Sequence, residues 1–174
     1  MAIPTRRATM VAWAATLVLA GCGGGGGDEV AAFGPAPVAS APVQADDLSC
    51  GIGGMSEQML AAINEARASA RSCGGQAFGA TTPLGWNAQL ASAAGAHASD
   101  MAVHNVVVLT GARGRRAADR AGAAGYTGAV GENLAGGQAS VPQVMKELLA
   151  SAAHCANIMD PSYRAMGVAC VKKS

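Results

Sequence analysis

The chain has 174 residues, of which 51% are hydrophobic but only 3% are aromatic and 13% are charged. Alanine occupies 41 positions, so the apolar fraction consists largely of methyl groups and overstates the hydrophobic core. One domain is expected, because domains usually have about 100 to 200 residues. The 12 basic and 11 acidic side chains almost cancel, which excludes a protein that binds nucleic acid through its overall charge.

The N-terminal 21 residues have the three-part pattern of a secretory signal peptide. Arg6 and Arg7 precede an apolar run over residues 10–20, and small residues end the segment. The run is well short of the roughly 20 residues that a transmembrane helix needs. We therefore predict that residues 1–21 are a signal peptide and not part of the fold.

The end of this segment, Leu19-Ala20-Gly21-Cys22, resembles the lipobox of bacterial lipoproteins. The resemblance implies that Cys22 is the lipid attachment point and that the membrane is a partner through this lipid. An ordinary cleaved signal with a chance cysteine is the alternative. Gly23 follows Cys22, which by resemblance to proteobacterial lipoproteins favours the outer membrane. The expected location is the bacterial cell envelope, as an outer membrane lipoprotein or a secreted or periplasmic protein.

Residues 22–47 are rich in glycine, alanine and proline and have no helical or strand period. Glycine-rich chain is flexible and proline favours extended polyproline II. We expect a disordered tether that holds the domain, residues 48–174, clear of the lipid surface.

Four cysteines remain in the domain: Cys50, Cys73, Cys155 and Cys170. An even number in an exported chain predicts two disulfides, for which three connectivities exist. We favour Cys50 with Cys73 and Cys155 with Cys170, which would tie the start of the domain to the first helix and the last helix to the last strand. A zinc site made by these cysteines is disfavoured, because no CxxC pair is present.

The domain begins with two predicted helices. Ser56 is a good N-cap for a helix that runs to about Arg71. A second helix is predicted from Asn87 to about Asn105, with an apolar stripe at helical spacing. The short apolar run at residues 106–109 is a candidate strand.

An arginine-rich turn at Arg113, Arg115 and Arg116 then leads to a short helix through Arg120 to Ala124. Ser140-Val141-Pro142-Gln143 is a capping box with proline in the first turn, and the helix that it starts has an apolar stripe through Ala152. Residues 166–171 are predicted to form a strand. Helices that alternate with short strands indicate layers of α/β type.

Six segments, taken together and in this order, resemble the CAP superfamily of cysteine-rich secretory proteins, antigen 5 and pathogenesis-related proteins, also called SCP domains, and specifically its bacterial branch. They are Ile63-Asn64-Glu65-Ala66-Arg67; Pro83-Leu84-Gly85-Trp86-Asn87; His97-Ala98-Ser99-Asp100-Met101-Ala102; Asp119-Arg120 with Gly125-Tyr126; Gly131-Glu132-Asn133-Leu134-Ala135; and His154-Cys155-Ala156-Asn157-Ile158-Met159. The resemblance implies a three-layer α-β-α sandwich with a small central antiparallel sheet and a cleft that holds histidine and glutamate side chains.

In many members of the superfamily, two histidines and acidic residues of this cleft bind a divalent metal such as zinc, which the residue types suit. Glu132 matches the glutamate and His154 one of the histidines, so these two are the weak metal candidates of this chain. Leu109 stands where the other histidine is expected, and Ser151 where eukaryotic members have a second acidic residue. The cleft is therefore degenerate.

Replacement groups exist in the sequence. His97 and His104 lie seven residues apart on the second helix, and Glu147 lies seven before His154. A relay of Ser151, His154 and Glu132 can also be drawn. Against them stand ordinary structural roles: a hydrogen-bonded core histidine at 97, an exposed one at 104, and no strained nucleophile turn around Ser151.

These observations favour an exported, lipid-anchored CAP domain protein that binds a lipid, glycan or protein ligand in its degenerate cleft without catalysing a reaction. The alternative is a metal-dependent hydrolase, a peptidase or esterase that uses Glu132 and His154. A purely structural envelope protein is the third interpretation.

Overall fold

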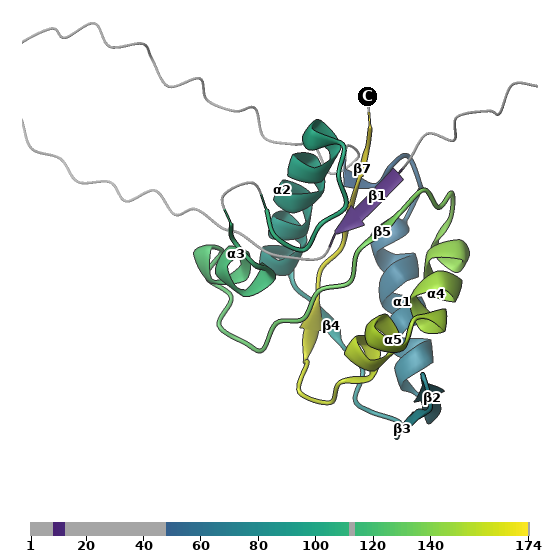
Figure 1. The fold of residues 1–174 in the computed structure, drawn as a ribbon. Coiled ribbons are helices and arrows are strands. Elements are labelled where there is room, and N and C mark those ends of the chain that lie inside the picture. The colour runs from purple at the N-terminus through teal and green to yellow at the C-terminus, as the bar shows by residue number, and fades with distance from the viewer. Residues whose placement is uncertain (1–8, 13–47, 112–113, 174) are drawn as a thin grey trace, which may run out of the picture.

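The computed structural model describes residues 9–12, 48–111 and 114–173. These described ranges contain five helices and seven short strands (Figure 1). The helices are α1 (Met55–Arg67), α2 (Ala88–His104), α3 (Ala117–Ala123), α4 (Val141–Ala150) and α5 (Ala152–Met159). The strands are β1 (Thr9–Ala12), β2 (Arg71–Cys73), β3 (Gln76–Phe78), β4 (Gly85–Trp86), β5 (Ala135–Gly136), β6 (Ala165–Met166) and β7 (Ala169–Lys172).

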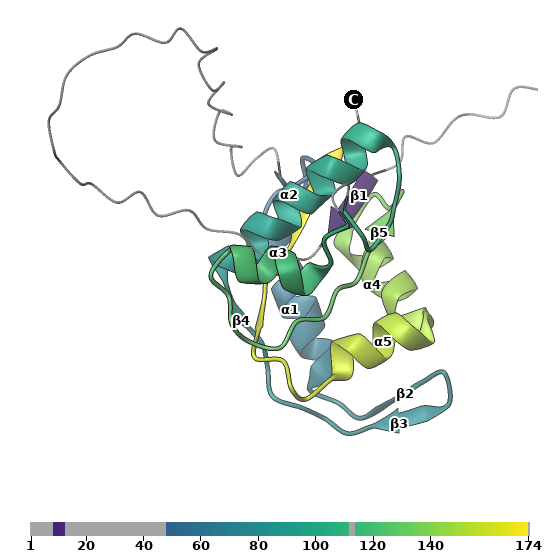
Figure 2. The same cartoon turned by 60° about the vertical axis from the view of Figure 1, so that its left-hand side comes forward.

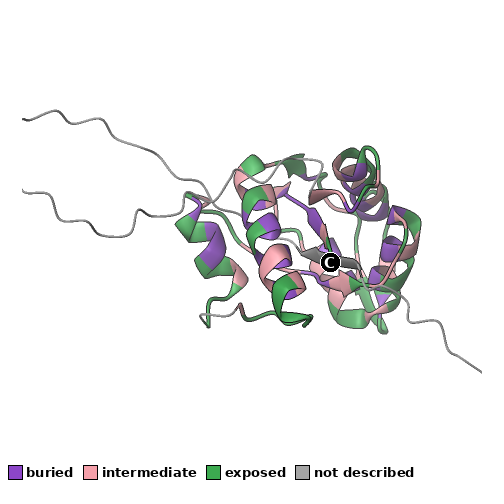
Figure 3. Cartoon of the chain, turned by 90° about the horizontal axis from the view of Figure 1, so that it is seen from above, coloured by how far each residue is buried: buried purple, intermediate pink, exposed green. Residues whose placement is uncertain are grey.

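The elements form three layers, as the sequence predicted. Helices α2 and α3 lie on one side of the strands, and α1, α4 and α5 lie on the other (Figures 1 and 3). The buried residues line the surfaces where these layers meet (Figure 3). No helix in the described ranges combines the length and apolar character needed to cross a membrane.

The middle layer contains a three-stranded sheet in the order β5-β1-β7. Strand β1 runs antiparallel to both neighbours, with Met10 opposite Gly136 on one side and Val171 on the other. In the uncut chain Thr9–Ala12 therefore pairs within the sheet. That residues 1–21 are a signal peptide stays a prediction. The predicted lipobox with Cys22 and the tether at residues 22–47 lie outside the described residues.

Two smaller pairs of strands complete the β structure. Strands β2 and β3 form a hairpin beneath α5 (Figure 2), and β4 pairs with β6 in parallel. The strand predicted over residues 166–171 is divided into β6 and β7 at Gly167. A Cβ atom there would overlap the backbone of α2 at Leu90 and Ala91, so only glycine lets the chain pass this close to the helix.

The residues at 106–109 form no strand, contrary to prediction. They are an exposed loop after α2, in which Leu109 is 57% exposed. Apolar and β-branched composition alone does not create a strand, because a strand also needs a neighbour with free backbone groups. In this structure β1 occupies the place between β5 and β7.

Local signals predict the helix limits well where a polar side chain caps the helix. Asn87 accepts a hydrogen bond from the Leu90 backbone N–H at 2.8 Å and starts α2, as predicted. The Ser140 hydroxyl accepts from the Gln143 N–H and starts α4. Ser56 is not the cap of α1, because Gly54 holds that position with φ of 63°.

The last predicted helix is two helices. It breaks at Ser151, whose backbone is extended with φ −87° and ψ 123°, and α5 follows directly. Leucine and alanine before Ser151 and alanine after it favour a continuous helix, so helix propensity does not reveal the break. The turn redirects the chain so that α5 packs across α1 above the β2–β3 hairpin (Figure 2).

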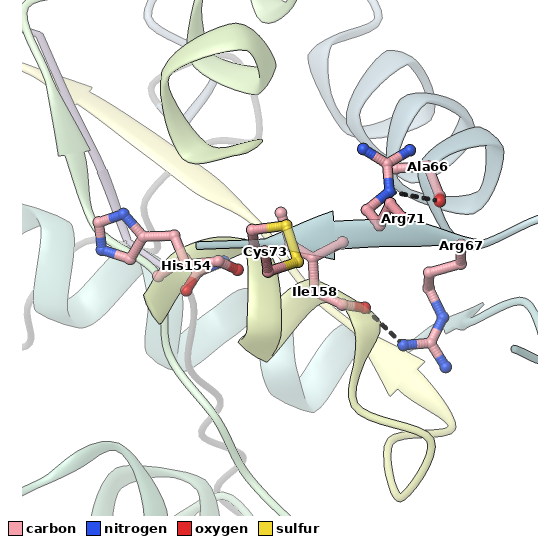
Figure 4. Close-up of a disulfide and its surroundings, with 8 residues drawn as sticks. Ala66, Arg67, Arg71, Cys73, His154 and Ile158 are labelled. Atoms are coloured by element: carbon pink, nitrogen blue, oxygen red, sulfur yellow. Dashed lines mark hydrogen bonds between the residues drawn. A yellow bond between two sulfur atoms is a disulfide. The ribbon is translucent and has the colours of Figure 1, made fainter. Parts of the chain in front are cut away.

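Arg67 joins several elements around the end of α1. Its side chain is fully buried and donates hydrogen bonds to the backbone carbonyls of Thr82 at 2.8 Å, Ile158 at 2.6 Å and Asp160 at 3.0 Å. Figure 4 shows it reaching from α1 to the end of α5. A buried guanidinium is tolerated when carbonyl oxygens satisfy its donors, as they do here.

Both disulfides are present, but the predicted connectivity is wrong. Cys50 is bonded to Cys170, with 5.2 Å between Cα atoms, and Cys73 to Cys155, with 5.5 Å. Ser49 forms a parallel β-bridge with Cys170, which brings Cys50 beside β7. Cys73 in β2 lies against α5 (Figure 4). These long-range neighbours follow from the tertiary fold and not from closeness in sequence.

Candidate functional site

Glu132 precedes β5 and forms a buried ion pair with Arg120 of α3. Its Oε1 lies 2.5 Å from the Arg120 Nη2, and the two side chains are only 4% and 6% exposed respectively. Arg120 also donates to the carbonyls of Arg115 at 2.6 Å and Leu109 at 3.4 Å. Burial raises the pKa of Glu132, and the hydrogen bond and charge of Arg120 oppose that rise.

Leu109, at the position of the expected histidine, contributes only its backbone carbonyl to this cluster. The carbonyl accepts from both terminal nitrogens of Arg120, while the side chain is exposed. The loop after α2 is therefore attached to α3 through the same guanidinium that holds Glu132.

His154 lies in the first turn of α5. Its backbone carbonyl accepts a hydrogen bond from Asn133 Nδ2 at 3.2 Å, and its imidazole points away from the Cys73–Cys155 disulfide (Figure 4). In the described residues no hydrogen bond or ion pair joins its side chain to Glu132. The predicted pair is connected through the backbone of His154 and the neighbour of Glu132.

Ser151 lies at the junction of α4 and α5, so it does not share a helix face with His154 in the predicted way. Its backbone N–H donates to the Leu148 carbonyl and its own carbonyl accepts from the Cys155 N–H. The geometry supports a structural role for Ser151, at the helix break, and the drawn relay with Glu132 has no hydrogen bond within the described residues.

The replacement ligands are also separated. His97 is 1% exposed and bonds through Nε2 to the Val108 carbonyl at 2.9 Å, whereas His104 is exposed and paired with Asp100. Burial, helped by the charge of Arg120, lowers the pKa of His97. Glu147 bonds to the amide groups of Gln138 and Gln143 at the surface.

A cavity of about 50 Å³ lies beside these residues, on the other side of the Gly-Glu-Asn segment. Aliphatic side chains form much of its wall, and a chain of hydrogen bonds lies at its polar end. Tyr163 donates to Asn157 Oδ1 at 3.0 Å, and Asn157 donates to Asn133 Oδ1 at 2.9 Å. The lining residues include Ile63, Leu84, Leu90, Ile158 and Met166.

Gly131 makes this arrangement of polar groups possible. A Cβ atom at Gly131 would overlap Asn157 Oδ1 and the Tyr163 hydroxyl. A larger residue here would therefore displace the ends of the Asn157 and Tyr163 side chains from their hydrogen bonds. The sequence motifs include Asn157 and Arg120 but not Tyr163. Their spacing gives no sign of the bonds from Arg120 to Glu132 and from Asn157 to Asn133, which span 12 and 24 residues.

The model of the Cysteine-rich secretory protein family, CAP, matches residues 60–174. The chain belongs to the CAP family. No curated protein and no solved structure matches it significantly. The match spans the motifs that hold Glu132, Asn133, His154 and Asn157.

The donors present in this CAP cleft do not fit the metal site that the superfamily resemblance implies. An open zinc site needs about three protein ligands. Glu132 directs an oxygen at Arg120, and position 109 offers no ligand side chain. The described residues contain no group of three histidine, cysteine or acidic side chains placed to hold an ion.

Replacing Arg120 should destabilise the fold, because the Glu132 carboxylate depends on this cation. We expect Arg120→Met to lower the free energy of unfolding by about 3–5 kcal/mol, because Glu132 is left buried without a partner. The double variant Arg120→Met/Glu132→Leu should recover most of this loss. Urea unfolding measures the free energies of the wild type, both single variants and the double variant, with the exposed Lys146→Met as control. Independent, additive effects of the two substitutions would contradict the pairing.

His97 should make the domain sensitive to acid. The fold lowers the pKa of His97 from its unfolded value of 6.5, so the unfolded chain binds the proton more readily than the folded one. The free energy of unfolding therefore falls as the pH drops below 6.5. His97→Gln keeps a donor for the Val108 carbonyl but does not titrate. Its unfolding free energy should fall less between pH 7 and pH 5 than that of the wild type.

The exposed His104→Gln is the control for the replacement of a histidine. Because the pKa of Glu132 is raised, that group contributes in the opposite sense, and the comparison is therefore made between variants. Equal slopes for His97→Gln and the wild type would contradict the assignment.

Proposed function

We propose that this CAP protein is exported to the bacterial envelope, anchored by a lipid on Cys22, and binds a ligand there without catalysing a reaction. The two disulfides support a location in an oxidising compartment outside the cytosol. The buried Glu132–Arg120 ion pair is the observation that carries the non-catalytic part of the proposal.

A general acid or base must reach the proton that it transfers, directly or through one water. The Glu132 carboxylate is buried and already accepts a charge-assisted hydrogen bond from Arg120. His154 is bound to the rest of the cleft through its backbone carbonyl. These contacts favour a structural role for the family motifs over acid–base or metal chemistry.

The cavity beside the cleft supports the choice of ligand. Its volume of about 50 Å³ is roughly a third of the engineered 150 Å³ cavity that binds benzene. It has room for a few carbon atoms, such as the end of an acyl chain or one aliphatic side chain. Asn133, Asn157 and Tyr163 would then face the polar part of the same ligand. We propose a lipid with an acyl chain as the ligand.

Ala129 offers a way to test this at the mouth of the cavity. It lines the cavity but is itself exposed, so Ala129→Phe should block the entrance without disturbing the core. Ala123→Phe, exposed at the end of α3, is the matched control. Delipidated protein is incubated with envelope extract and examined by native mass spectrometry.

We expect the wild type and Ala123→Phe to retain a bound lipid and Ala129→Phe to lose at least tenfold in occupancy. Failure of the wild type to capture any lipid would contradict the proposal. So would metal-stimulated hydrolysis of peptides or esters that disappears in His154→Ala, because that result would make the protein an enzyme.

A further inference from the structure

Strand β1 holds a central place in the sheet although it belongs to the predicted signal peptide. Both β5 and β7 pair with β1, and in the described sheet they do not pair with each other. Removal of residues 1–21 would take away the strand that joins them. The processed protein would then contain a gap one strand wide, which we call the strand slot, between Ala135–Gly136 and Ala169–Lys172.

The strand slot cannot close easily. Neighbouring strands lie about 4.8 Å apart, so β5 and β7 are separated by about twice that distance. The Cys50–Cys170 disulfide fixes β7 to the start of the domain. At Gly167, just before β7, the backbone packs closely against α2, which limits how far β7 can move toward that helix. Backbone groups that faced β1 would lose their partners, and burying them unpaired is costly.

We propose that, after residues 1–21 are removed, the strand slot takes up an extended, uncharged segment of another polypeptide chain, antiparallel to β7. The proposal rests on the predicted export processing but not on the lipid cavity. The present occupant shows the chemistry required. Thr9–Ala12 is uncharged, contains no proline or glycine, and lies opposite Ala169 and Cys170, both of them buried.

The chain before Ser49 is poorly placed to supply the strand. Cys170 is paired with Val11 on one side and with Ser49 on the other, so the chain that precedes Ser49 reaches β7 at the edge opposite the strand slot. Prolines at positions 35, 37 and 42 also remove backbone donors from that chain. A second processed copy also lacks β1, so it cannot supply the segment that occupies the strand slot here.

Addition of a strand through backbone hydrogen bonds is an established way for proteins to bind extended peptides. Backbone bonds would supply the affinity on both sides of the inserted segment. Ala135 and Ala169, which lie beside the inserted segment, have small side chains. The side chains that the segment can carry are therefore determined by what packs on the two faces of the sheet. The partner is therefore a protein with an exposed, uncharged stretch of at least four residues.

The test uses the full chain with a site for a specific protease placed within residues 22–47. The folded, oxidised protein is cut, and a fluorescent peptide of residues 8–14 is added in excess. Fluorescence anisotropy measures its uptake, and hydrogen exchange measures protection of the β5 and β7 amides. A peptide with N-methyl groups at positions 10 and 11 and one with Val11→Asp are the controls.

We expect the peptide to replace the cut N-terminal fragment and to keep both strands protected. The N-methylated and Val11→Asp peptides should bind at least 100-fold more weakly. No uptake at large excess overturns the proposal, whether the original fragment stays in place or the strands remain protected after it leaves. Two further results would reject a foreign strand: peptide uptake that fails only because residues 22–47 block it, and dimerisation of the cut protein in place of peptide uptake.

N-terminal sequencing of the exported protein tests the processing step separately. A start at Cys22 is expected. An intact N-terminus would mean that β1 is retained and would overturn the proposal, whatever the lipid-capture experiment shows. Lipid capture without peptide uptake would overturn the strand slot and leave the proposed function standing.

Discussion

The cleft of this protein is organised by one buried charge pair, Arg120 with Glu132. Removing two ions from water is expensive, so such a pair persists only where the geometry is good and the remaining donors are satisfied. The terminal nitrogens of Arg120 also bind the carbonyls of Leu109 and Arg115. A single guanidinium thus joins α3, the loop after α2 and the Gly-Glu-Asn segment.

The next residue, Asn133, organises the opposite side of the same segment. It donates to the His154 carbonyl and accepts from Asn157, which in turn accepts from Tyr163. Glu132 and Asn133 thus bind different helices, α3 and α5. The motif that holds the chemistry in a metal-binding family member here joins the outer layers of the sandwich and forms the polar end of a small apolar cavity.

The fold could be predicted where the determining interaction is local. Asn87 and Ser140 cap their helices with their own side chains, and the alanine stripe of α2 is visible as a period in the sequence. The six motifs give the family and the three layers. The same motifs contain Glu132, Asn133, His154 and Asn157, and in the structure Asn133 bonds to the His154 carbonyl and to Asn157.

What failed depends on neighbours that are distant in sequence. The disulfides follow the bridge between Ser49 and Cys170, which no spacing reveals. The helix break at Ser151 follows from how α5 packs on α1. Arg120 could not be told from the other arginines, because its role depends on a carboxylate twelve residues away that is buried only in the folded chain. Likewise, hydropathy predicts that residues 9–12 belong to a signal peptide. Their pairing with β7 becomes visible only in the folded chain.

The central claim is that the family cleft has become a structural and binding site and is not a metal centre. Calorimetric titration of zinc into the folded, oxidised protein, with His154→Ala as control, tests this most directly. Our account predicts the same weak, non-stoichiometric heats for both proteins. Tight binding of one zinc ion that His154→Ala abolishes would contradict it, because Glu132 would then have to leave Arg120 to act as a ligand.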